Sequence, residues 1–221
     1  MKYLLVGGSG FIGLHFFRKL NKNSIINIDV NGGIKDLDFV KCDITSVNEL
    51  NNIDILNYNE VTLIHLAAVH FDFQNEYFKT NVDGTKNILN FIEKNKNINQ
   101  FVFFSSVATY GISNDGKAEN DKQSPINDYG KSKLEAEQEI MMWHKKNPNV
   151  KTIIVRPAVV FGEYNFGNVY NLINQINSGF FAVIGKGQNI KSVAYAGNLV
   201  ESVIFALKKL DKGILIYNYS D

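Results

Sequence analysis

The first thirteen residues constrain the fold of this chain more than any other stretch. Residues 3–6 are a short apolar run, long enough for one buried strand, and apolar residues at helical spacing begin at Phe11 and Ile12. Between them lies a glycine turn with the spacing Gly7-x-x-Gly10-x-x-Gly13. A strand, a glycine turn and a helix in this order are typical of a dinucleotide-binding fingerprint, although the spacing differs from G-x-G-x-x-G. Because glycine lacks a Cβ, a pyrophosphate can approach the turn and the positive end of the helix that follows.

A second apolar run, residues 24–30, predicts a second strand with Asp29 near its end. An acidic residue at this position can hydrogen-bond the ribose hydroxyls of a bound adenosine and would repel a 2′-phosphate. Residues 30–34 offer no Arg or Lys to clamp such a phosphate. The sequence therefore favours NAD over NADP, the alternative being that Asp29 is an ordinary acidic loop residue.

The rest of the chain alternates apolar runs with helical stretches. Further strands are predicted at 38–43, 61–67, 100–105, 152–155 and 214–217, and helices are predicted at 81–94 and 128–145, with 49–58 a helix or a loop. Such alternation predicts an α/β fold, a doubly wound parallel sheet of the Rossmann type. No internal repeat or linker is visible.

Composition excludes several function classes. The 221 residues carry 23 basic and 22 acidic side chains, a net charge of +1, so no basic surface for nucleic acid is indicated. A single cysteine, Cys42, excludes an internal disulfide framework and a cysteine-based metal site, and no metal is expected. No apolar run reaches membrane-spanning length, and the chain starts directly with a strand, leaving no room for a signal peptide. We expect a soluble, cytoplasmic protein.

Several polar or small residues stand where predicted strands end, which is where sites collect in such sheets. Ala67 and Ala68 would let a flat ring pass close to the backbone, and His70, just beyond them, is a candidate substrate contact. His65 lies within an apolar run and is interpreted as a hydrogen-bonded core residue. Asn81 is expected to hydrogen-bond to the strand that follows it.

Tyr129 and Lys133 are four residues apart in a predicted helix, and therefore share one face. A neighbouring lysine ammonium, together with the positive charge of an oxidised nicotinamide ring, favours the phenolate and lowers the pKa of a tyrosine, which could then take a proton from a substrate hydroxyl. Lys133 can also hold the nicotinamide ribose, and Ser106 can orient the same substrate oxygen. A Y-x-x-x-K pair alone is weak, because such pairs are usually solvated. The catalytic interpretation is supported by the order of four features along the chain: the glycine turn, an acidic strand end, a Ser-Ser strand end and then Y-x-x-x-K.

With these features in place, the chain resembles an extended short-chain dehydrogenase/reductase of the NDP-sugar epimerase/dehydratase family. The matching motifs are GGSGFIG (7–13), Asp29, CDI (42–44), HLAA (65–68), NVDGT (81–85), FFSSVATYG (103–111), YGKSKLEAE (129–137) and RPAVVFG (156–162). The resemblance implies that Ser106, Tyr129 and Lys133 are the catalytic triad. It implies a cofactor site formed by Gly7, Gly10, Phe11, Ile12, Gly13, Asp29, Asp43, Ile44, Ala67, Ala68, Ser105, Tyr129, Lys133 and Pro157, with Asp43 and Ile44 at the adenine.

The chain departs from the family's dehydratases after the triad serine. Where those enzymes carry Asp-Glu, this chain has Val107 and Ala108, which cannot move a proton, so dehydration is disfavoured. Val107 also provides no cysteine acid, and only His70 keeps the reductase-epimerase branch open. The best supported activity is NAD-dependent epimerisation of a nucleotide sugar at C4 through a 4-keto intermediate. The alternatives are an NAD(P)H-dependent reductase of an NDP-keto sugar or another carbonyl, and a non-catalytic nucleotide-binding or sensing protein.

The C-terminal part resembles the family's substrate side. We expect a nucleotide-binding domain over 1–165 and a partial substrate-binding region over 166–221, interleaved with a returning helix and strand. In this region Lys191 takes the place of the usual Arg near the nucleotide diphosphate, and Gly197-Asn198 replaces a frequent Asp-Asp. Family members usually continue further, so we expect either a truncated or a naturally short member. A homodimer through paired helices, including the one that carries Tyr129, is implied by the resemblance.

Overall fold

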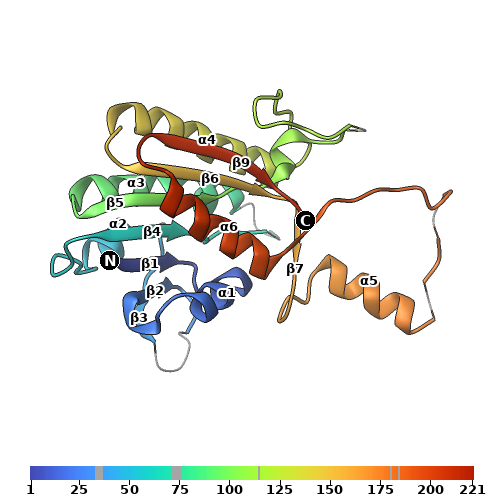
Figure 1. Ribbon diagram of the computed structural model, residues 1–221, viewed down its shortest axis with the longest axis horizontal. Helices are drawn as coiled ribbons and strands as arrows, with labels where there is room; N and C mark the ends of the chain where they lie inside the picture. The colour runs from blue at the N-terminus through green and yellow to red at the C-terminus, as the bar shows by residue number, and fades with distance from the viewer. Residues whose placement is uncertain (33–36, 71–75, 114, 180, 184) are drawn as a thin grey trace.

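A seven-stranded parallel sheet organises the chain (Figure 1). The structure, a computed structural model, describes residues 1–32, 37–70, 76–113, 115–179, 181–183 and 185–221. In spatial order the strands are β3 (Asp38–Lys41), β2 (Ile25–Asp29), β1 (Lys2–Val6), β4 (Val61–His65), β5 (Ile98–Phe104), β6 (Lys151–Pro157) and β9 (Ile214–Tyr219). The order reverses between β1 and β4, which is where doubly wound sheets bind ligands. The predicted fold class is confirmed.

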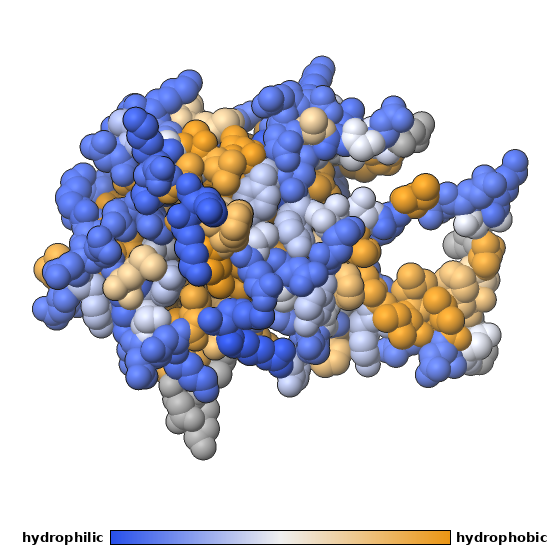
Figure 2. Space-filling view, in the orientation of Figure 1, coloured by the Kyte–Doolittle hydropathy of each residue, from blue (hydrophilic) through white to orange (hydrophobic). Residues whose placement is uncertain are grey.

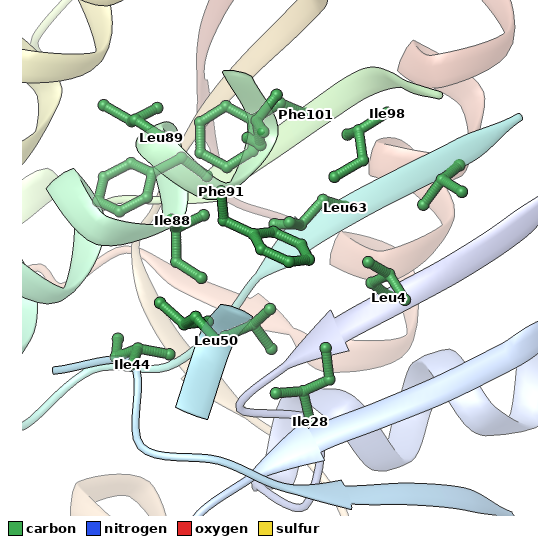
Figure 3. Close-up of a cluster of buried hydrophobic side chains, with 14 of the residues drawn as sticks. Leu4, Ile28, Ile44, Leu50, Leu63, Ile88, Leu89, Phe91, Ile98 and Phe101 are labelled. Carbon is green, nitrogen blue, oxygen red and sulfur yellow. The ribbon is translucent and has the colours of Figure 1, made fainter. Parts of the chain in front are cut away.

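Helices cover both faces of the sheet (Figure 1). One face packs against α1 (Phe11–Lys19) and α6 (Ala196–Lys209), and the other packs against α2 (Val47–Asn51), α3 (Gly84–Lys94) and α4 (Asp128–Lys146). Successive strand residues alternate between the two cores: Leu4 belongs to the second and Leu5 to the first. Figure 3 shows the core beneath α2 and α3, where Leu63 meets Ile88 and Phe91. Burial on both faces explains why the central strands are mostly apolar, whereas the edge strand β3 (DFVK) is not.

The elements beyond residue 157 were predicted less completely. The expected strand at 214–217 is β9, which pairs with β6, and the expected returning helix is α6. The sequence analysis missed β7 (Val159–Phe161), β8 (Val193–Tyr195) and α5 (Asn168–Asn177). Strands of three residues are too short for a period to show. In α5 the apolar side chains of Leu172, Ile173 and Ile176 are exposed, and Figure 2 shows apolar residues gathered at that end of the molecule.

Two further predicted elements changed in detail. The helix expected from residue 81 begins as a π-helical turn, Lys79–Asp83, before α3, and the stretch 49–58 contributes only the end of the short α2.

In the part of the chain that the structure describes, no helix has the length and apolarity to cross a bilayer, and no cluster of three or more His, Cys, Asp or Glu could hold a metal. Cys42 is buried and free, and burial raises the pKa of its thiol to about 11.

Candidate active site

Two of the three fingerprint glycines are required by the packing of the chain itself. Gly7 has a φ of 81°, and a Cβ there would lie 2.4 Å from the backbone nitrogen of Ala67. A Cβ at Gly13 would lie 2.0 Å from the carbonyl oxygen of Gly8. Real side chains do not tolerate such distances, so the end of β1, the start of α1 and the end of β4 can meet only with glycine at these two positions.

Gly10 has no such internal reason to be glycine. Its φ is −74°, it is exposed, and a Cβ at this position would meet only the Gly7 carbonyl oxygen, at 3.3 Å. Gly10 caps α1 without a side-chain hydrogen bond, and the first turn, all of it described, contains no acidic residue. The N–H groups at the start of α1, including those of Phe11 and Ile12, therefore have no acidic side chain of their own turn to compete with a bound anion. The space in front of these N–H groups, a cradle that a Cβ at Gly10 would fill, fits a pyrophosphate.

Asp29 holds the glycine turn as well as the end of β2. One carboxylate oxygen accepts a hydrogen bond from the Ser9 backbone nitrogen at 3.0 Å, and the other accepts one from the Asn31 backbone nitrogen at 3.0 Å. Each oxygen keeps further acceptor capacity for a ribose hydroxyl. Residues 30–34 contain no Arg or Lys that could bind a 2′-phosphate, as stated from the sequence. Residues 33 and 34 of this stretch lie outside the described residues.

The other predicted cofactor contacts lie along the same edge of the sheet. Asp43 accepts a hydrogen bond from the Thr45 backbone nitrogen at 2.8 Å, while Ile44 is buried and its side chain occupies the space that a Cβ at Gly84 would need. The remaining contacts are half-buried or buried where β4, β5 and β6 end: Ala67, Ala68, Ser105 and Pro157. An edge with small side chains fits a flat, extended dinucleotide.

Ser106 and Tyr129 are brought together by the way two helical segments begin. Ser106 follows β5 and caps the 3-10 turn Val107–Tyr110, its hydroxyl accepting a hydrogen bond from the Ala108 nitrogen at 3.1 Å. Tyr129 lies in the first turn of α4. At Gly130 a Cβ would lie 2.6 Å from the Ala108 carbonyl oxygen, so glycine lets α4 start directly against the serine turn. The Tyr129 hydroxyl is then hydrogen-bonded to Ser106.

The electrostatics of Tyr129 differ from the expectation. Burial raises its pKa to about 12, the hydrogen bond to Ser106 lowers it in part, and Tyr77 raises it. Lys133 is buried, lies 4.4 Å above the ring of Phe103, and has a pKa lowered to about 7 by burial, against the opposing effect of Glu137. The expected lowering of the Tyr129 pKa depends on two charges, that of Lys133 and that of an oxidised nicotinamide ring, and it stays a prediction. With a pKa of about 7, Lys133 is only about half charged at pH 7, so by itself it provides less positive charge than an ordinary lysine.

The remaining predicted residues separate into those near Tyr129 and those away from it. The ring of His70 lies 5.1 Å from that of Tyr129, and its pKa is lowered to about 4 by desolvation and by the charge of Lys133, although its outer surface is exposed. Val107 follows Ser106 and is half-buried. Lys191 is exposed on the extended segment after α5. His65 is buried, with Nε2 3.0 Å from the Thr85 hydroxyl, which confirms its interpretation as a core residue.

The pairing of the buried polar groups around the triad was not predicted from the sequence. Asn81 bonds the Val69 backbone at the end of β4 and the Ser132 hydroxyl of α4, and not the next strand as expected. Glu137 forms a buried ion pair with Arg156. One signal was available: Glu137 stands four residues after Lys133, on the same helical face.

Comparison with known proteins identifies relatives for nearly the whole chain. The model of a family described as the NAD dependent epimerase/dehydratase family matches residues 3–219. An N-acetyl-alpha-D-glucosaminyl-diphospho-ditrans,octacis-undecaprenol 4-epimerase of Escherichia coli O157:H7 is 38% identical over 99% of the chain and 66% of its own length. A UDP-glucose 4-epimerase of Vibrio cholerae is 26% identical over 91% of the chain and 65% of its own length.

Solved structures show the same fold. The crystal structure of a UDP-glucuronic acid 4-epimerase from Bacillus cereus in complex with NAD superposes with a TM-score of 0.82 at 24% identity, covering all of this chain and 78% of that one. The chain thus spans about two thirds of the length of the curated relatives it matches.

Proposed function

The chain belongs to the NAD dependent epimerase/dehydratase family, whose cofactor is NAD, and on this premise we propose that it inverts C4 of a sugar linked through a diphosphate. The observation that carries the proposal is the contact of Tyr129 with Ser106 at the sheet edge that also holds the glycine turn and Asp29. A proton acceptor beside a dinucleotide cradle is the arrangement that reversible oxidation of an alcohol requires.

The names of the relatives support the substrate class. One acts at C4 of an N-acetylglucosaminyl diphosphate on undecaprenol, and another on UDP-glucose. What these substrates share is a hexose on a diphosphate, so the sugar diphosphate is the common element and the carrier is the variable one. Nucleotide sugars are therefore the first substrates to offer, and a polyprenyl diphosphate sugar is the second.

The side chains of this chain account for the proton chemistry. Tyr129 accepts the proton of the C4 hydroxyl, and Ser106, hydrogen-bonded to Tyr129, holds the same substrate oxygen. When bound, NAD supplies the reversible two-electron oxidation of C4. The positive ring of bound NAD, together with the charged form of Lys133, would lower the pKa of Tyr129, which burial, Ser106 and Tyr77 together set at about 12 in the chain alone. In the reverse direction Tyr129 returns the proton to the oxygen of the 4-keto sugar.

Inversion without dehydration is supported by the residues that follow Ser106. Dehydration at C5 and C6 needs groups that remove and deliver protons. Val107 and Ala108, the first two residues of the 3-10 turn, have only aliphatic side chains. With no acid or base at these positions, the keto sugar is expected to rotate within the site, so that C4 is reduced from the opposite face.

The experiment is product analysis by NMR. The purified chain with NAD is incubated with UDP-glucose, with UDP-N-acetylglucosamine and with a short-chain polyprenyl diphospho-N-acetylglucosamine, and the anomeric and H4 signals are followed. Conversion to the galacto epimer without net consumption of reduced cofactor supports the proposal, and the carrier that reacts fastest identifies the substrate. Net formation of NADH with a keto sugar as product would favour an enzyme of the dehydrogenase/reductase type, and no turnover of any carrier would contradict the proposal.

We also propose that two copies associate through helices that include α4, as the family resemblance implies, and analytical ultracentrifugation would test it. A cytoplasmic location and the lack of nucleic-acid and membrane partners stay predictions from the sequence.

A further inference from the structure

A buried ion pair lies one helical turn from Lys133. The Glu137 side chain is fully buried and that of Arg156 is 3% exposed. Arg156 Nε donates to one carboxylate oxygen at 2.9 Å, and Nη2 donates to the other at 2.6 Å, a two-pronged geometry. A pair taken out of water is retained only when its remaining hydrogen-bonding groups find partners, and both members of this pair have them.

The partners of this pair lie beside the segments that carry the predicted catalytic residues. Glu137 also accepts a hydrogen bond from the hydroxyl of Ser105, the residue before Ser106, and one from the amide of Gln123 at 3.1 Å. Arg156 precedes Pro157 and donates through Nη1 to the Tyr110 hydroxyl at 2.6 Å. Tyr110 ends the 3-10 turn that Ser106 caps. The pair therefore links the end of β5, the serine turn, α4 and the end of β6.

From this geometry we propose that Glu137 is a positioning residue of the active site: its carboxylate fixes the Ser105–Ser106 strand end against α4, and so holds Ser106 and Tyr129 in contact. The proposal rests on the proposed function for its kinetic consequences only. A positioning role differs from a general stabilising role because Glu137 binds the hydroxyl of Ser105. The next residue, Ser106, is the serine that contacts Tyr129.

The same carboxylate also sets the charge around Lys133. Among the described residues, the ionisable groups that interact electrostatically with Lys133 are Glu137 on its own helix, and His65 and His70 from β4 and the segment after it; Tyr129 shares its helical face. Glu137 provides the negative charge among them, and it also balances Arg156. Replacing Glu137 by glutamine keeps the shape but leaves Arg156 without a counter-charge near Lys133. The pKa of Lys133 should then fall below its present value of about 7.

The test compares Glu137→Gln with a matched control on the same helix, Glu139→Gln, whose partly exposed carboxylate lies 3.4 Å from Lys86. Two quantities are measured: kcat for epimerisation, and the pKa of Lys133 in the cofactor-free chain, from the ¹³Cε signal in a lysine-labelled sample. For Glu137→Gln we expect kcat to fall by about tenfold to a hundredfold, as for a misplaced reacting group, and the Lys133 titration to move to lower pH. For Glu139→Gln both stay as in the wild type.

A second variant covers the case in which Glu137→Gln does not fold. Ser105→Ala keeps the ion pair and removes only the hydrogen bond to the strand end; we expect a several-fold lower kcat with an unchanged pKa of Lys133. A folded Glu137→Gln protein with wild-type kcat and an unmoved Lys133 titration would overturn the proposal, as would unchanged kcat in Ser105→Ala. If the wild type turns over no sugar diphosphate, the proposed function fails, while the Lys133 titration still decides whether Glu137 controls that site.

Discussion

Replacing Gly10 by alanine separates the role of the glycine turn in folding from its role in binding. A Cβ at Gly10 meets only the Gly7 carbonyl oxygen, at 3.3 Å, and φ is −74°, so alanine fits the backbone. Alanine is a poorer N-cap than glycine by up to about 1 kcal/mol. For a chain of this size that corresponds to a fall of roughly 2–4 °C in Tm. Gly13→Ala should be far more damaging, because its Cβ would lie 2.0 Å from backbone.

The loss in cofactor binding should be much larger than the loss in stability. The methyl group would stand where the pyrophosphate approaches the N–H groups of α1, and each hydrogen bond to a charged group contributes about 1.5–3 kcal/mol. Losing one of them raises the Kd for NAD by roughly tenfold to a hundredfold. Calorimetric titration with NAD measures the Kd, and thermal unfolding measures Tm. The control is Gly116→Ala, at which a Cβ would meet no atom of the described structure within 4 Å. A folded Gly10→Ala protein that binds NAD like the wild type would refute the reasoning.

Three further predictions follow from the same geometry. Tyr129→Phe should lower kcat by roughly 10² to 10⁴ while the Kd for NAD changes little, as rapid-quench kinetics and calorimetry would show; retained turnover would exclude Tyr129 as the base. Asp29→Asn keeps the hydrogen-bond acceptor to Ser9 but removes the charge, so the ratio of the NADP and NAD dissociation constants should fall; an unchanged ratio would argue against Asp29 as the selector. Burial, with Lys133, lowers the pKa of His65 to about 3, below its ordinary value of 6.5, so its contribution to stability is complete above pH 6.5 and is lost as the pH falls towards 3. In urea unfolding, the free energy of unfolding should fall by up to about 1.4 kcal/mol more per pH unit in the wild type than in His65→Gln. Equal slopes for the two proteins would contradict this prediction.

The parts of the fold that could be predicted from sequence are those where one local pattern determines one structure. The strands β1, β2, β4 and β5 are rich in apolar residues because both of their faces are buried, and the glycine turn is conspicuous because Gly7 and Gly13 have steric reasons to be glycine. The three-residue strands β7 and β8 and the asparagine-rich α5 were not visible, because no period develops over three residues and α5 packs few of its apolar side chains.

The site divides in the same way. Ser106, Tyr129 and Lys133 could be proposed from motif order, but their electrostatics could not, because the pKa of Lys133 depends on a burial that only the packed helix shows. Glu137 and Arg156 lie nineteen residues apart in the sequence, and nothing local relates the two. Such pairs become visible only when α4 and β6 are placed side by side.

The central claim is that the hydrogen on C4 leaves and returns within one site while Tyr129 handles the hydroxyl proton. It is tested most directly by running the reaction in D₂O with UDP-N-acetylglucosamine or the carrier that reacts best, and reading the C4 and C5 positions of substrate and product by NMR. The account predicts a C4 epimer that carries protium at both carbons, formed by the wild type and not by Tyr129→Phe. Deuterium at C4 or C5, or equal conversion by Tyr129→Phe, would contradict it.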